Sequence, residues 1–162
     1  MRFTLWNRSA RAPAISAPPA RHFELGHRGE ALALEHLEQA GYQIVAANFS
    51  LPVGRNRRDV VVNAELDIVA YDGPVLCFVE VKTRASDEIA SPHVNIDLRK
   101  RRQIARAALA YRRMMGLREV SYRYDVVTVV LADIERPRIQ LLKNFWSSET
   151  LRRRTSYHAY WD

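Results

Sequence analysis

The sequence predicts an α/β protein in which helices flank one mixed sheet, with the elements in the order α-β-β-β-α-β. Two stretches, residues 24–40 and 97–115, repeat apolar side chains at helical spacing. Between them the turn signal Asp72-Gly73 joins two short apolar runs, and a β-branched run follows at 122–131. The 162 residues suffice for one domain, and a hydrophobic content of 48% excludes a chain that is disordered throughout.

Each helical stretch is flanked by residues that typically start or end helices. The first repeats apolar residues every three or four positions, at Ala33, Leu34, Leu37 and Ala40. Gly41 follows it, as expected of a C-terminal cap. The second begins at Asp97, a favourable N-cap residue, and stops at Gly116.

Strands are expected at 43–49, 65–71, 75–82 and 122–131, with a short final strand at 139–142. The strands at 65–71 and 75–82 form a hairpin around Asp72-Gly73. The basic stretch 50–63 (SLPVGRNRRDVVVN) carries two short apolar pieces around a turn, so it is either a protruding hairpin or a loop.

The chain divides into one folded domain and two tails. Residues 1–22 hold three prolines and four arginines but no acidic residue, which is typical of a disordered tail. Residues 23–146 form the α/β domain, and residues 147–162 form a basic, aromatic C-terminal tail. No apolar run is long enough to span a bilayer, and the single cysteine, Cys77, lies in an apolar run. We therefore expect a cytoplasmic protein without membrane partners.

The charge balance favours a polyanionic partner. The net charge is +7, from 25 basic and 18 acidic residues, and lysine occurs only at positions 82, 100 and 143. Arginine supplies the remaining basic residues, and its guanidinium group forms paired hydrogen bonds with phosphate. Nucleic acid is the natural partner, although an arginine-rich composition without a ligand explains the charge equally well.

The residues with catalytic chemistry lie in the central hairpin. With a two-residue turn at Asp72-Gly73, Glu65 lies opposite Glu80 and Asp67 lies opposite Phe78. Glu65, Asp67, Glu80 and Lys82 then project from one face of the sheet, whereas a slip of one residue would separate Asp67 from Glu80.

Carboxylates that face each other repel, and a divalent cation is the simplest compensation. We expect Asp67, Glu80 and the backbone carbonyl of Val81 to bind Mg²⁺ or Mn²⁺, with Glu65 as a further candidate ligand. Lys82 would stabilise the charge that develops on a reacting phosphate, or orient and deprotonate the attacking water. The alternative is a surface salt-bridge cluster without metal. Against this alternative, Glu80 lies within the apolar strand Val79-Glu80-Val81, where a charged residue is unusual unless it is paired or functional.

A third acid, Glu30, lies on the helical stripe that carries Leu34 and Leu37 and that should face the sheet. There we expect Glu30 to be a catalytic residue that completes the metal shell, directly or through water. The alternative is an ordinary first-turn glutamate that the helix dipole favours.

These residues resemble a known family. An E-x-D strand followed by an apolar strand that ends Glu80-Val81-Lys82 resembles the PD-(D/E)xK nuclease superfamily, whose core has the order αβββαβ of a restriction-endonuclease-like fold. More specifically, the chain is similar to the YraN family of small bacterial proteins, which is related to archaeal Holliday-junction resolvases. The matching stretches are GHRGEA at 26–31, GY at 41–42, NF at 48–49, ELDIVA at 65–70, FVEVKTR at 78–84, RK at 99–100 and YDVV at 124–127.

The resemblance implies that Asp67 and Glu80 bind metal, that Lys82 is the catalytic lysine and that Glu30 is the acid that accompanies the site. The chain departs from the family at Ala64, where a glycine is usual, and at 50–63, which is longer than usual and suggests an insertion.

Three groups of basic residues are candidate nucleic-acid contacts. The second helix carries Arg99, Arg102, Arg106 and Arg113 in one stripe, beside an apolar stripe of Ile104, Ala108, Tyr111 and Met115. Such a basic stripe follows a phosphate backbone without reading sequence, although a solvated helix face has the same pattern. The second group is Arg55, Arg57 and Arg58, and the third is Arg84 and Lys100. The five histidines have no zinc-ligand spacing.

The leading hypothesis is a Mg²⁺-dependent endonuclease that acts on DNA, including branched or damaged DNA. DNA is favoured over RNA, and cleavage of a symmetric junction would require a homodimer. The alternatives are a nucleic-acid-binding protein that keeps the nuclease fold without catalysis, and a scaffold that binds proteins.

Overall fold

The structure is a computed structural model, and it describes residues 20–85 and 95–153. Its elements are α1 (Ala20–Gln39), β1 (Gln43–Arg55), β2 (Val61–Asp72), β3 (Val75–Arg84), α2 (Leu98–Met114), β4 (Tyr122–Val130), β5 (Arg138–Trp146) and α3 (Ser148–Arg153). The first helix thus begins at Ala20, inside the expected N-terminal tail, whose residues 1–19 lie outside the described part. Residues 154–162 of the expected C-terminal tail also lie outside it.

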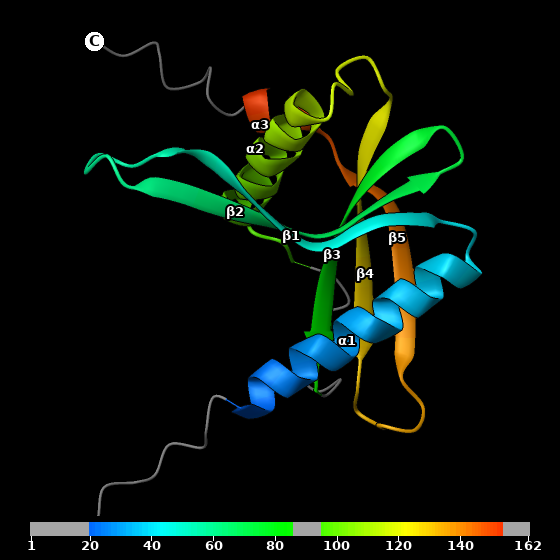
Figure 1. Cartoon of the computed structure of the whole chain (residues 1–162). Coiled ribbons are helices and arrows are strands. Elements are labelled where there is room, and N and C mark those ends of the chain that lie inside the picture. Colours follow the sequence, from blue (N-terminus) through cyan, green and yellow to red (C-terminus); the bar gives the residue numbers. More distant parts are fainter. Residues whose placement is uncertain (1–19, 86–94, 154–162) are drawn as a thin grey trace, which may run out of the picture.

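The five strands form one mixed sheet in the order β1-β2-β3-β4-β5 (Figure 1). All neighbours are antiparallel except β3 and β4, which are parallel. A parallel pair needs a crossover connection, and α2 provides it. The predicted fold class, a mixed sheet flanked by helices, is confirmed. No helix in the described ranges is long and apolar enough to cross a membrane.

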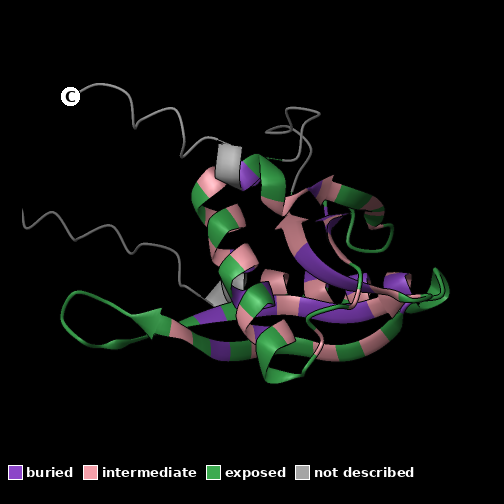
Figure 2. Ribbon diagram, turned by 90° about the horizontal axis from the view of Figure 1, so that it is seen from above, coloured by how far each residue is buried: buried purple, intermediate pink, exposed green. Residues whose placement is uncertain are grey.

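Each face of the sheet has its own hydrophobic core. The α1-side core contains Leu37, Ile68 and Val79, and the α2-side core contains Phe78, Tyr111 and Tyr124, among others. Because both faces are covered, β3 is buried from Leu76 through Glu80 (Figure 2). Cys77 is fully buried as expected, and burial raises the pKa of its thiol to about 12.

Residues 50–63 form a protruding hairpin, which decides between the two structures that the sequence allowed. We call this segment the hairpin arm; β1 continues to Arg55 and β2 begins at Val61. The tip is ordered by Asn56, whose side-chain oxygen accepts hydrogen bonds from the N–H groups of Arg58 and Val60. Figure 2 shows the exposed arm projecting from the body of the molecule. At the other end of the chain, β5 is longer than the strand expected at 139–142.

The turn between β2 and β3 differs from the prediction. Asp72 pairs with Val75, so the two loop residues are Gly73 and Pro74 rather than Asp72 and Gly73. Proline has no N–H to contribute to the ladder, and Gly73 adopts the positive φ of 57° that the first loop position of a type II′ turn requires.

This turn shifts the register by two residues. The ladder pairs Ile68 with Val79 and Val69 with Phe78, so the predicted opposition of Asp67 to Phe78 and of Glu65 to Glu80 is wrong. Counting one residue beyond the last pair places Asp67 level with Glu80. Side chains alternate with a period of two, so a shift of two residues leaves Asp67, Glu80 and Lys82 on their predicted face.

A kink in the β1–β2 hairpin lies beside Asp67. Asn48 has a φ of +51°, and its neighbours Ala47 and Phe49 pair with Ile68 and Leu66, so Asn48 stands level with Asp67. In a regular strand Leu66 and Ile68 would share a face, yet Leu66 packs in the α2-side core and Ile68 in the α1-side core. The kink therefore turns the hairpin arm out of the sheet at the level of Asp67.

Helix α1 approaches β3 closely through a glycine. A Cβ atom on Gly29 would lie 1.8 Å from the Oγ1 atom of Thr83, the residue that follows Lys82. Only a residue without a side chain therefore lets this turn of α1, with Glu30, lie against the end of β3.

We expect Gly29→Ala to lower the free energy of unfolding by about 1–3 kcal/mol, because the added methyl group overlaps Thr83. Gly26→Ala is the matched control: it lies one turn earlier, nothing lies within 4 Å of its added Cβ, and the helix gains about 1 kcal/mol of propensity. Urea denaturation of both variants measures the difference. Equal stabilities would contradict the close approach.

Candidate active site

The candidate active site lies at a fork between β2 and β3. The two strands pair only as far as Ile68 and Val79, whereas β3 continues beside β4 to Arg84. Beyond the fork, β2 leaves with β1 toward the hairpin arm (Figure 1). The Asp67 carboxylate fills the fork, and its Oδ2 atom accepts a hydrogen bond of 2.8 Å from the N–H of Val81. A side chain thus replaces the missing strand partner.

Glu80 is a buried carboxylate with two cationic partners. It is only 3% exposed, and its Oε1 lies 2.9 Å from the Nζ of Lys82 and its Oε2 lies 3.1 Å from the Nζ of Lys100. Lys82 comes from the same strand, and Lys100 comes from the first turn of α2. A buried carboxylate is tolerated only when it is paired, and the pair with Lys100 also attaches α2 to the sheet.

The two acids of the fork are electrostatically coupled. Burial raises the pKa of Asp67 from 3.8 to about 7, the negative charge of Glu80 adds to that rise, and the Val81 N–H opposes it. Burial alone would lower the pKa of Lys100, but the charges of Glu80 and Asp67 outweigh it and leave that pKa above its ordinary value. Protonation of Asp67 would remove the repulsion between the two carboxylates, and a cation beside them would stabilise both in the ionised form.

Glu30 is linked to the fork through Asn48. The side-chain nitrogen of Asn48 donates a hydrogen bond of 3.1 Å to Glu30, and the imidazole of His27 lies 3.7 Å from the same carboxylate. Since Asn48 stands level with Asp67 on the neighbouring strand, Glu30 lies at the edge of the site. Its expected catalytic role stays a prediction.

The remaining expected metal ligands do not gather around the fork. In the described ranges, no three His, Cys, Asp or Glu side chains lie close enough together to hold a metal, so Glu30 and Glu65 do not join Asp67 and Glu80 in such a set. The N–H of Val81 holds Asp67, and its carbonyl as a ligand stays a prediction. Two adjacent carboxylates still suit Mg²⁺, which takes one or two from a protein and completes its shell with water and phosphate.

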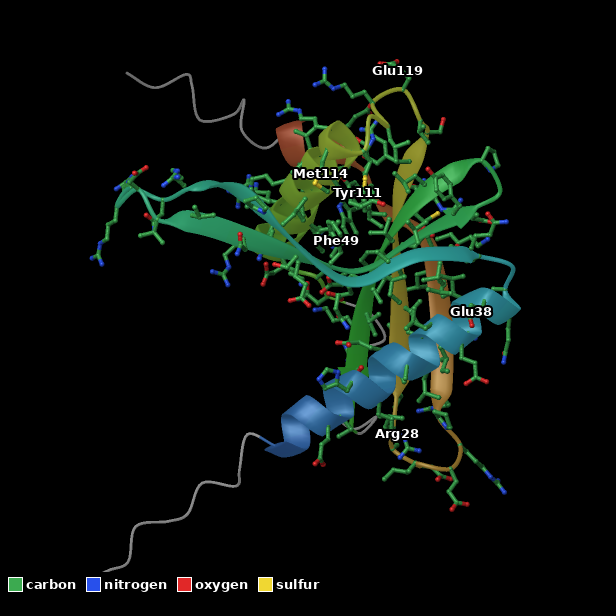
Figure 3. The ribbon with its side chains drawn as sticks, in the orientation of Figure 1. Arg28, Glu38, Phe49, Tyr111, Met114 and Glu119 are labelled. Carbon is green, nitrogen blue, oxygen red and sulfur yellow. The ribbon has the colours of Figure 1, made fainter. Side chains whose placement is uncertain are left out.

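The expected basic stripe of α2 lies on its exposed side. Arg99, Arg102, Arg106 and Arg113 are exposed, while Ile104, Ala108 and Tyr111 are buried. Tyr111 packs edge-on against Phe49 of β1, with ring centres 5.4 Å apart (Figure 3). Met115 is 47% exposed, so its assignment to the apolar stripe is wrong: it follows the last residue of α2 and caps the helix.

The other basic candidates differ in how far they are engaged within the protein. Arg55 donates a hydrogen bond of 2.7 Å to the carbonyl of Asp59 in its own arm, whereas Arg57 and Arg58 are exposed at the tip. Arg84 is half-buried at the end of β3. Lys100 lies inside the fork cluster rather than on the exposed side of α2.

Sequence reasoning missed two contributions to the site. Asn48 received no role, although asparagine is one of the few residues that adopt a positive φ readily. Lys100 was expected only as a phosphate contact, because nothing in a single sequence shows that the first turn of α2 reaches Glu80.

A second buried acid, on the α1 face of the sheet, is structural. Asp125 is fully buried, and it accepts hydrogen bonds from the hydroxyl of Tyr42, the Nε of Arg123 and the N–H of Asn144. Arg123 also pairs with Asp72, which lies at the turn between β2 and β3. These bonds satisfy the carboxylate and join the end of α1 to β4 and β5.

Comparison with known proteins places the chain in a family. Residues 29–129 match the model of the uncharacterised protein family UPF0102. A UPF0102 protein of Koribacter versatilis is 40% identical over 123 residues, which is 76% of this chain and 79% of that protein. A UPF0102 protein of Porphyromonas gingivalis is 42% identical over 126 residues, 77% and 85% of the two chains, and one of Geobacter sulfurreducens is 39% identical over 120 residues, 74% and 86%.

The chain therefore belongs to the UPF0102 family, and its resemblance to the YraN-like proteins is confirmed. The matched residues contain the whole fork, from Glu30 through Asp67 and Glu80 to Lys100.

The raised pKa of Asp67 predicts that this residue destabilises the metal-free protein. A carboxyl group whose pKa is higher in the folded state contributes its full stability below its unfolded pKa, here 3.8, and loses that contribution as the pH rises through about 7. Asp67→Asn keeps an acceptor for the Val81 N–H but carries no charge. At pH 8 without divalent cations, we expect it to raise the free energy of unfolding by on the order of 2 kcal/mol.

Urea denaturation between pH 4 and pH 8 in EDTA measures this effect. The increase in the free energy of unfolding of Asp67→Asn over wild type should shrink toward pH 4. Asp133→Asn, at an exposed carboxylate that accepts a local turn bond from the N–H of Glu135, is the control and should change little at any pH. A gain that grows toward low pH would contradict the assignment.

Proposed function

We propose that this protein is a Mg²⁺-dependent phosphodiesterase that hydrolyses DNA at the fork. The observation that carries the proposal is the buried Glu80 with Lys82 2.9 Å away, next to Asp67, whose pKa is raised to about 7. Acids with strongly shifted pKa values beside a cationic group are typical of functional sites. Repulsion between two carboxylates costs stability, so it is not expected in a cluster that serves structure alone.

The fork offers the charges that phosphodiester hydrolysis needs. Water adds across a P–O bond: its oxygen bonds to phosphorus, the bond to the leaving oxygen breaks, and the leaving oxygen gains a proton. The ammonium group of Lys82 stabilises the charge that develops on the non-bridging oxygens. Asp67 and Glu80 would hold the divalent cation, which when bound neutralises phosphate charge and makes water more acidic.

The surrounding basic residues provide contacts to a DNA backbone on two sides of the fork. Arg99, Arg102, Arg106 and Arg113 line the exposed side of α2, and Arg57 and Arg58 lie at the tip of the hairpin arm. About ten residues separate Asp67 from the tip, which corresponds to roughly 30 Å of strand, or about nine base pairs. The arm thus extends the contact with duplex DNA by nearly one helical turn.

Cleavage of labelled duplex, single-stranded and four-way-junction DNA tests the proposal, with Mg²⁺, Mn²⁺ or EDTA present. We expect cleavage that requires metal, and a loss of roughly a hundredfold or more in Lys82→Ala and in Asp67→Ala, because each removes a charge at the reacting phosphate. Lys143→Ala is the matched control: it removes the same charge from the same sheet, but Lys143 pairs with Asp72 at the opposite end. Unchanged cleavage by Asp67→Ala would refute the proposal.

A second candidate function is nucleic-acid binding without turnover. The observation that favours it is that Glu80 already has two ammonium partners, so the site has part of its compensation without metal. This candidate predicts salt-sensitive binding that Asp67→Ala does not weaken and no cleavage under any metal condition.

Binding of duplex DNA should depend on the hairpin arm. We expect Arg57→Ala combined with Arg58→Ala to reduce the slope of log K against log salt by about 2, because two phosphate contacts are lost. This reduction in the salt slope should appear with a duplex of about 20 base pairs and vanish with a duplex too short to reach the tip of the arm. Fluorescence anisotropy measures it. Arg118→Ala, in the loop between α2 and β4, is the control. If the salt slope changes by the same amount per substituted arginine in the arm variant and in Arg118→Ala, the arm has no special role.

A further inference from the structure

A pocket on the outer side of α2 has the properties of a ligand site and lies apart from the fork. It has a volume of about 490 Å³ and lies between α2, α3 and the start of β4. Pockets of about 300–1,000 Å³ with apolar walls and a few polar groups are typical of small-ligand sites. Leu109 and Leu151 form apolar walls here, and Arg102 and Arg106 lie at its edge. We call it the α2–α3 pocket.

One arginine of the pocket is held in place by the protein. The guanidinium group of Arg112 lies 3.9 Å from the ring centre of Tyr122. Its Nε donates a hydrogen bond of 3.2 Å to the carbonyl of Leu117, and its NH2 group donates to the carbonyls of Arg118 and Val120. Arg112 and Tyr122 therefore form a rigid, flat, cationic surface against which an aromatic ligand can stack.

Two further arginines are not engaged in this way. Arg102 and Arg106 are exposed, lie one helical turn apart, and form no hydrogen bond or ion pair with another described residue. Like charges at this spacing destabilise a helix. A bound phosphate, which accepts hydrogen bonds from both guanidinium groups, would remove that repulsion.

The remaining wall carries neutral hydrogen-bonding groups. The hydroxyls of Tyr122 and Tyr124 lie 3.2 Å and 3.1 Å from the Oγ of Ser148. Burial raises the pKa of Tyr124 to about 12, so this phenol stays protonated at neutral pH. Neutral hydroxyls can pair with the polar edge of a nucleobase without adding charge.

We propose that the α2–α3 pocket binds one unpaired nucleotide of a single-stranded segment of nucleic acid. Arg102 and Arg106 hold its phosphate, and its base lies between the leucines and the Arg112–Tyr122 surface, as bases do on aromatic and arginine platforms. The inference rests on the proposed function in one respect, that the partner is nucleic acid.

The position of the pocket defines which substrates would use it. Tyr122 stands level with Leu76 of β3, four residues before Glu80, which corresponds to roughly 13 Å along the sheet. Helix α2 joins the two sites, since Lys100 contacts Glu80 and Arg102 lies at the pocket. A substrate with a single-stranded flank beside the cleavage position can reach both sites, whereas a blunt duplex has no unpaired base to insert.

The test compares two DNA ligands in EDTA, so that cleavage has no part in it: a blunt duplex, and the same duplex with an oligothymidine overhang. We expect wild-type protein to bind the overhang ligand about tenfold more tightly by fluorescence anisotropy. Arg102→Ala combined with Arg106→Ala should remove that preference. Leu109→Trp should remove the overhang preference as well, because the larger side chain narrows the pocket without a change of charge. Leu109 is 44% exposed, so the substitution does not disturb the core.

Arg99→Ala combined with Arg113→Ala is the matched control: it removes two exposed charges from the same helix outside this pocket. It should weaken both ligands equally and keep the preference, and thermal melting confirms that each variant is folded. A retained overhang preference in Leu109→Trp, or no preference in the wild type, overturns the inference. If the protein cleaves a blunt duplex but shows no overhang preference, the nuclease proposal stands and the pocket proposal is refuted. If it shows the preference but cleaves no DNA, the pocket proposal stands and the nuclease proposal is refuted.

Discussion

Burial of the Glu80 carboxylate is the constraint on which the rest of the site depends. A carboxylate that is 3% exposed must be compensated, and it obtains its two cations from different elements, Lys82 of β3 and Lys100 of α2. The ion pair with Lys100 fixes the start of α2 against the sheet. The outer side of that helix, with its arginines and its pocket, is thereby placed at a defined position relative to the fork.

Three backbone features bring the acids together. The kink at Asn48, with its positive φ, turns β1 and β2 away from the sheet and opens the fork. The Val81 N–H, which has no strand partner there, binds Asp67 instead. Gly29 lets α1 approach Thr83, so that Glu30 reaches the same edge through Asn48. Each feature weakens regular secondary structure, and together they expose polar groups at one end of a strand that is otherwise buried.

The two faces of the sheet show how a structural acid differs from a reactive one. Asp125 receives hydrogen bonds from a tyrosine, an arginine and a backbone N–H, which satisfy it completely within the protein. Asp67 receives one N–H and faces a second carboxylate, so its charged form is disfavoured. Asp67 is therefore less completely compensated than Asp125, and that difference distinguishes the fork as the candidate site.

The sequence by itself determined the order of the elements from α1 to β5, though not α3, and the face on which Asp67, Glu80 and Lys82 lie, because side-chain alternation and helical spacing are local properties. The face survived a register error of two residues for the same reason. Only the tertiary structure decided that Asp67 is level with Glu80, that Lys100 reaches Glu80, that residues 50–63 form an arm and that α2, α3 and β4 line a pocket. These features depend on a proline in a turn, a kink and contacts between residues far apart in the chain, and local periodicity carries no information about them.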